Sequence, residues 1–170
     1  MDKSASTEFD RVRAAIERSK KYLYKKGMIL IVDDKLEERK KARVIVEAAG
    51  YLTHTCDFPV DDSDADWQNF LFYLSVSDGV LTDLVNLRGK PQGLLIALEA
   101  VSQGKPVVIC TNTKEQGGHH GEAIGWIYDG YFARVKTRVG WIEVIPDDQG
   151  VWEKNWVGAI ELLKQRIKST

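Results

Sequence analysis

The feature that most constrains the fold is an uninterrupted apolar run, Met28–Val32, which ends at a pair of acids, Asp33 and Asp34. A strand with one face in water alternates apolar and polar side chains, whereas this run is apolar throughout. Such a run is typical of a parallel strand that is covered on both faces. We therefore expect a sheet with helices packed on each side of it.

The rest of the chain repeats the pattern of a strand followed by a helix. Further strands are predicted at Tyr51–Cys56, Gly79–Leu84, Pro106–Cys110 and Tyr131–Val135. Helices are predicted near 35–49, 67–76, 93–101 and 122–128, with a last one whose apolar stripe begins at Trp156. Five such units in series predict an α/β fold, a doubly wound five-stranded parallel sheet.

Two segments fall outside this alternation. Residues 7–26 have helical spacing and end at Gly27, which predicts an extra N-terminal helix over residues 1–27 and one globular domain over residues 28–170. Residues 139–145 predict an appended strand or hairpin before the last helix. Trp141, Trp152 and Trp156 lie in this segment or shortly after it, and they indicate either local packing or a partner-binding surface.

Composition narrows the classes of partner. The 170 residues carry 24 Lys and Arg against 25 Asp and Glu, a net charge of −1, so no overall field attracts nucleic acid or an anionic membrane. The apolar runs are far shorter than the roughly 20 residues that a membrane-spanning helix needs. We expect a cytoplasmic protein without a nucleic-acid or membrane partner.

Polar side chains stand at the carboxyl ends of three predicted strands. They are Asp33, Asp34, Asp83 and Thr111. In a doubly wound sheet the functional crevice lies beyond these strand ends, so we expect the side chains to converge. Neighbouring carboxylates repel each other unless a hard cation lies between them, and Mg²⁺ suits such ligands.

The same acids suit chemistry at phosphorus. One carboxylate would act as the nucleophile, while a metal and nearby donors stabilise the charge on the transferred group. The Thr111 hydroxyl and a cation after the predicted fifth strand, either Arg134 or Lys136, would supply those donors.

Four segments, in this order, carry a resemblance to a known family. They are Ile29–Asp34, Gly50–Tyr51, Leu81–Leu84 and Pro106–Thr111. Together they look like a response-regulator receiver domain, over about residues 28–136 and the final helix. The resemblance implies a flavodoxin-like or receiver-like sheet.

By position, the resemblance also implies roles for the strand-end residues. Asp83 would accept a phosphoryl group, and Asp33 and Asp34 would hold Mg²⁺ with it. Thr111 would be the switch hydroxyl that follows the phosphate.

The lysine that the family carries after its fifth strand has two candidates here. Aligning Gly130–Arg134 with the family's strand selects Arg134 and places Tyr131 at the switch aromatic position. Reading Val135 and Lys136 as the family's Val-Lys pair selects Lys136 instead. Both alternatives stay open, and Arg is not equivalent to Lys at such a site.

Three functions are compatible with these features. The first is a stand-alone receiver-like signalling protein, phosphorylated on Asp83 by a histidine kinase or phosphotransfer protein with Mg²⁺. It would act through a downstream protein partner rather than by turnover, with a second copy of the chain as a candidate partner. The second is a degenerate receiver-fold interaction module without phosphotransfer. The third is a small Mg²⁺-dependent phosphotransfer enzyme or phosphatase.

Overall fold

The sheet of this protein consists of parallel strands. The computed structural model describes residues 3–22, 27–59, 64–84, 91–112, 139–144 and 153–169. The strands are β1 (Met28–Val32), β2 (Leu52–Cys56), β3 (Gly79–Thr82), β4 (Val107–Asn112) and β5 (Val139–Val144). They pair in the order β2-β1-β3-β4-β5, and each pairing is parallel. The predicted α/β class and parallel sheet are confirmed.

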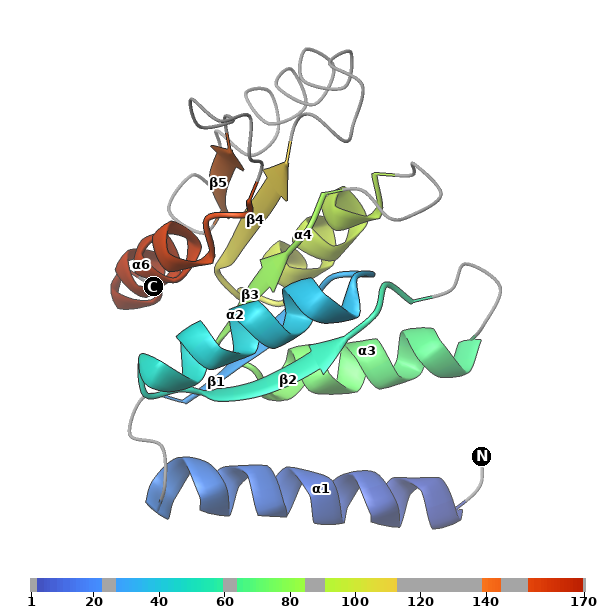
Figure 1. Cartoon of the computed structure of the whole chain (residues 1–170). Helices are drawn as coiled ribbons and strands as arrows, with labels where there is room; N and C mark the ends of the chain where they lie inside the picture. The colour runs from blue at the N-terminus through green and yellow to red at the C-terminus, as the bar shows by residue number, and fades with distance from the viewer. Residues whose placement is uncertain are drawn as a thin grey trace.

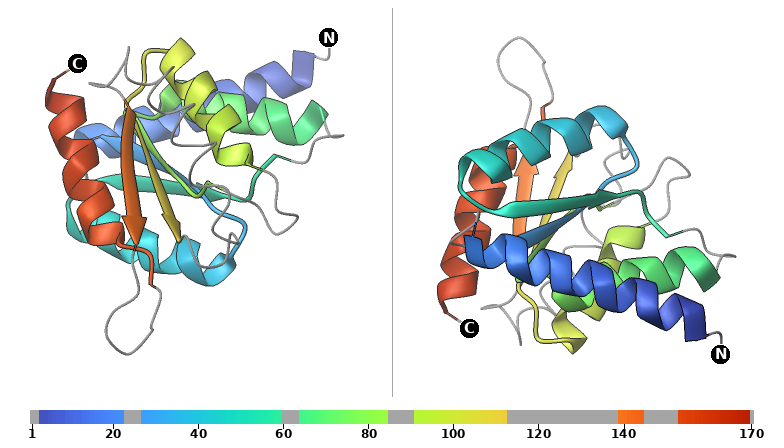
Figure 2. Two further views of the ribbon diagram at one scale, coloured as in Figure 1. Left: turned by 90° about the horizontal axis from the view of Figure 1, so that it is seen from above. Right: turned by 90° about the horizontal axis from the view of Figure 1, so that it is seen from below.

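Helices cover both faces of this sheet (Figures 1 and 2). They are α2 (Leu36–Ala48), α3 (Asp64–Val76), α4 (Gln92–Ser102) and α6 (Trp156–Lys168). Leu30 and Val32 of β1 join a buried cluster with residues of α3 and α4. Ile29 and Ile31 join a second cluster with residues of α2 and α6. The alternation of side chains along a strand explains how one continuous apolar run supplies both cores.

The fifth strand differs from the one expected. The predicted strand Tyr131–Val135 and the predicted helix 122–128 lie outside the described residues. The strand next to β4 is Val139–Val144, which falls in the segment predicted as an appended strand. The last helix then returns over β4 and β5 and also contacts α2.

The N-terminal helix α1 (Lys3–Tyr22) lies beside α3 at the edge of the sheet (Figure 1). The ring of Phe9 packs on the ring of Phe72, with 4.6 Å between their centroids. The Arg13 guanidinium lies 5.9 Å from the same Phe72 ring. The helix therefore packs on its own domain. The division of the chain at residue 27 stays a prediction.

No helix in the described ranges is both long and apolar enough to span a lipid bilayer.

A close approach between α4 and the end of β3 depends on Gly93. A β-carbon at this position would lie 1.9 Å from the carbonyl oxygen of Asp83 and 2.7 Å from the α-carbon of Leu84. The Gly93 amide donates to the Leu84 carbonyl at 2.9 Å. Because these neighbours are backbone atoms, they cannot move aside as a flexible side chain would.

We predict that Gly93→Ala lowers the free energy of unfolding by about 3 kcal/mol, through forced separation of α4 from the β3 end. Urea denaturation would measure the change. Leu95→Ala on the same helix is the control, because Leu95 is 54% exposed and should change stability by less than about 0.5 kcal/mol. Equal stability of the Gly93 variant and the wild type would contradict the prediction.

Candidate functional site

The candidate site lies where the order of the strands reverses. From β1 the chain passes outward to β2 and then crosses to β3 on the other side of β1. In open α/β sheets the crevice for ligands lies beyond the carboxyl ends of the strands at such a point. Asp33 and Asp34 follow β1, and Asp83 follows β3.

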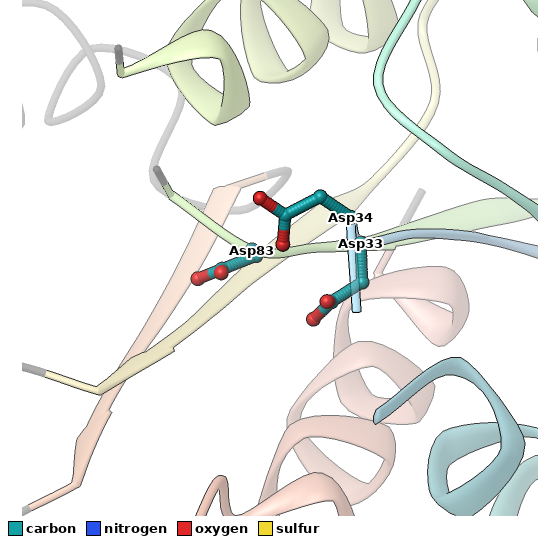
Figure 3. Close-up of side chains that lie close together, drawn as sticks. All are labelled: Asp33, Asp34 and Asp83. Atoms are coloured by element: carbon teal, nitrogen blue, oxygen red, sulfur yellow. The ribbon is translucent and has the colours of Figure 1, made fainter. Parts of the chain in front are cut away.

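The structure brings these three acids together, as Figure 3 shows. One carboxylate oxygen from each of Asp33, Asp34 and Asp83 lies within 4.8 Å of the others. Asp33 and Asp83 are buried, at 0% and 5% exposure. Parallel pairing of β1 with β3 produces this convergence, because it sets both strand ends at the same edge of the sheet.

A lysine from the far end of the chain lies between two of these acids. The Lys154 ammonium is 2.5 Å from Asp33 Oδ2 and 2.7 Å from Asp83 Oδ2. All three side chains are almost completely buried, with 4% exposure for Lys154. The site is therefore a buried cluster of acids that is bridged by one ammonium group.

The predicted cations, Arg134 and Lys136, lie outside the described residues. Neither prediction included Lys154, which is the cation that contacts Asp83 in the described part of the chain. The available signal was its position directly before Asn155, a residue type favoured at helix N-caps, at the start of the predicted last helix.

The start of α6 fixes the backbone of Lys154. The Asn155 side chain caps the helix by accepting a hydrogen bond from the Gly158 amide at 2.8 Å. The next residue, Trp156, is 1% exposed and belongs to the core between α6, α2 and the sheet. A capped helix end and a buried tryptophan thus hold the residue that enters the site.

The acids are held by backbone amides as well. The Lys35 amide donates to Asp33 Oδ1 at 2.8 Å, and the Leu84 amide donates to Asp83 Oδ1 at 2.7 Å. The Arg39 guanidinium donates to the backbone carbonyl of Asp33. These bonds fix one oxygen of each buried carboxylate and leave the other directed at Lys154.

Burial dominates the electrostatics of the cluster. It raises the pKa of the Asp33 and Asp83 carboxyls, although the Lys154 ammonium opposes this effect in both. Burial alone would lower the pKa of Lys154, but the two carboxylates outweigh it and hold that pKa above its ordinary value. Lys154 is therefore charged at neutral pH.

Thr111, the predicted switch hydroxyl, is fully buried in β4, the strand adjacent to β3. It pairs in register with Glu143 of β5. The predicted switch aromatic Tyr131 lies outside the described residues.

The donor set suits a hard divalent cation. Three carboxylates against one ammonium leave two negative charges uncompensated among these four side chains. Carboxylate oxygens are the ligands that Mg²⁺ prefers in proteins. The residues present therefore fit such an ion, which would share Asp33 and Asp83 with Lys154.

A solved receiver structure shares the fold of this chain. A response regulator receiver protein from Sinorhizobium medicae WSM419 superposes with a TM-score of 0.56 and 18% identity, covering 84% of this chain and 95% of its own. The chain has the receiver-domain fold. A response regulator receiver domain protein from Clostridium thermocellum matches with a TM-score of 0.48 and 14% identity, covering 85% of this chain and 99% of its own.

Sequence comparison adds nothing to this likeness. No protein-family model matches the chain, and no curated protein matches it. At 18% identity, the likeness to the receiver protein is one of fold.

We predict that Lys154→Met lowers the free energy of unfolding by about 3–5 kcal/mol, because it leaves buried carboxylates without their cation. Chemical denaturation at neutral pH would measure the loss. Lys40→Met is the matched control, since Lys40 pairs with Glu37 at 2.7 Å on the surface and should change stability by less than about 1 kcal/mol. A small loss for Lys154→Met would show that the buried pair contributes little.

We predict that Asp83→Asn, unlike Lys154→Met, raises the free energy of unfolding in buffer free of divalent ions. Removing one of three crowded carboxylates relieves burial and repulsion and keeps the pair between Lys154 and Asp33, so stability should rise by about 1–2 kcal/mol. Asp10→Asn on the exposed face of α1 should leave stability unchanged. A less stable Asp83 variant would refute this electrostatic account.

Proposed function

We propose that this chain is a receiver-like signalling protein in which Asp83 accepts a phosphoryl group from a histidine kinase or phosphotransfer protein. One observation carries the proposal. The Asp83 carboxylate lies at the strand-order reversal, with two further acids beside it and the Lys154 ammonium 2.7 Å away. A nucleophilic carboxylate beside a fixed cation is an arrangement suited to phosphoryl transfer.

In the transfer step an Asp83 carboxylate oxygen forms the new bond to phosphorus as the bond from phosphorus to the donor breaks. The leaving group of the donor keeps that electron pair. The Leu84 amide, which donates to Asp83 Oδ1, and the Lys154 ammonium, which pairs with Oδ2, fix the orientation of the carboxylate. Positioning of this kind lowers the entropic cost of reaching the transition state, because the nucleophile is already oriented before it reacts.

Asp33, Asp34 and Asp83 are the residues that would hold Mg²⁺. The ion, when bound, would reduce the repulsion between these carboxylates and an incoming phosphoryl group. The Lys154 ammonium, which directly precedes the N-cap of α6, would then stabilise negative charge at Asp83.

The output of such a protein would be a change in protein contacts. The buried Thr111 hydroxyl, on the strand next to Asp83, is the proposed switch that follows the phosphate. The proposed partners are the phosphodonor and a downstream protein, and the proposed location is the cytoplasm. A second copy of the chain is a further candidate partner.

One observation favours the alternative of a degenerate interaction module. Lys154 pairs with both Asp33 and Asp83, so a cation of the chain itself compensates part of the acid charge. A receiver fold that had lost phosphotransfer could keep its buried acids because a lysine of the same chain compensates part of their charge. The two functions differ in whether Asp83 gains a phosphoryl group.

The deciding experiment is intact-mass analysis after incubation with acetyl phosphate and Mg²⁺. We predict a labile addition of about 80 Da, one phosphoryl group, in the native chain. Asp83→Asn should show none, because it lacks the nucleophile. Asp10→Asn should behave as the native chain, since Asp10 is exposed on α1.

A chelator added to the native chain should prevent the addition, because the ion would no longer offset the acid cluster. If the native chain gains no mass with Mg²⁺ present, the phosphoacceptor function is wrong and the interaction module remains.

A further inference from the structure

A hydrogen bond joins the start of α6 to the first turn of α2. The indole Nε1 of Trp156 donates to Glu38 Oε2 at 2.9 Å. Trp156 is 1% exposed, and the Glu38 side chain is 16% exposed. This bond spans 118 residues of sequence, and it seats the first turn of α6 on α2. In a partly buried site, a hydrogen bond to a charged acceptor is stronger than a hydrogen bond between neutral groups.

The same tryptophan contacts the lysine of the site. The Lys154 ammonium lies 5.6 Å from the centroid of the Trp156 ring. Within about 6 Å of an indole face a cation is attracted by the ring quadrupole, most strongly when it is desolvated. The Lys154 side chain is 4% exposed, so its ammonium is largely desolvated where it contacts the ring.

Glu38 remains ionised in this position. Burial alone would raise the pKa of its carboxyl, but hydrogen bonds from Trp156 and from Lys41 outweigh burial and lower it. Lys41 donates to Glu38 Oε1 at 3.0 Å. The carboxylate therefore offers one oxygen to the indole and the other to Lys41.

We propose that Glu38 and Trp156 form a clamp that positions Lys154 between Asp33 and Asp83 and couples the charge of the site to the seating of α6 on α2. The geometry of the clamp stands without phosphotransfer, whereas its regulatory meaning rests on the proposed function. In this view Trp156 and Glu38 are positioning residues and touch no reacting atom.

The coupling follows because one group, the Lys154 ammonium, contacts both Asp83 and the Trp156 ring. A phosphoryl group on Asp83 would change the charge that faces the Lys154 ammonium, and Lys154 directly precedes the cap of α6. Any displacement of the ammonium alters its contact with the Trp156 ring and so the bond to Glu38. By linkage, a partner that loosens α6 from α2 would change phosphorylation of Asp83.

The test is the rate at which an N-hydroxysuccinimide acetate ester acetylates Lys154, followed by peptide mass spectrometry. The variants are Trp156→Phe, which keeps a ring but removes the indole N–H, and Glu38→Gln, which removes the charge. The control is Glu37→Gln, because Glu37 precedes Glu38 and pairs with Lys40 in the same i,i+3 geometry at the surface. Acetylation of Lys168, which is exposed at the last turn of α6, serves as the internal standard.

We expect Lys154 to be acetylated about tenfold faster in Trp156→Phe and in Glu38→Gln, and at the native rate in Glu37→Gln. The double variant should match Trp156→Phe, since without the indole N–H the side chain at position 38 has no bond to Trp156 left to weaken. Native rates in both single variants, or additive effects in the double variant, would overturn the clamp. If Trp156→Phe fails to fold, Glu38→Gln decides alone.

This readout is independent of phosphotransfer. Faster acetylation in the variants with no 80 Da addition in the native chain would support the clamp and reject the proposed function. Where the native chain does accept a phosphoryl group, the clamp variants should accept it about tenfold more slowly, because Lys154 is less well positioned. Unchanged phosphorylation rates in both would overturn the coupling.

Discussion

The ion pairs that Lys154 makes with Asp33 and Asp83 join three elements of this fold. The two acids directly follow β1 and β3, and the lysine directly precedes the N-cap of α6, so the ion pairs join these elements at the carboxyl ends of the strands where the strand order reverses. Apolar packing holds the rest of the sheet, with β1 contributing to the cores on both of its faces. Without the ammonium, this edge would carry buried carboxylates that nothing in the described site compensates equally well.

Such a cluster is costly for the folded state and useful for chemistry. Hydrophobic residues of similar volume would stabilise the same position better than buried charges do. Three acids at a strand-order reversal, together with a lysine that only partly offsets their charge, fit a hard divalent cation.

The sequence predicted the local elements well because each depends on neighbouring residues. The apolar run of β1, the acids after β1 and β3 and the last helix, with its apolar stripe from Trp156, all follow from local spacing. The cation could not be predicted in this way. Lys154 lies 121 residues from Asp33 in sequence, and it reaches the site from the segment between β5 and α6. Contacts of this kind depend on the packing of α6 and on no local pattern.

The position of Lys154 explains why it needs the tryptophan and Glu38. A cation at the amino end of a helix faces the positive end of the helix dipole, which disfavours it. Burial adds to that cost, because the ammonium loses its water. Asp33 and Asp83 supply the main compensation, and the Trp156 ring, which bonds to the Glu38 carboxylate through its indole N–H, supplies more. The ammonium thus contacts the acids after both strands and Trp156 of α6, and Trp156 in turn bonds to Glu38 of α2, so a change in charge at Asp83 would act where α6 meets α2.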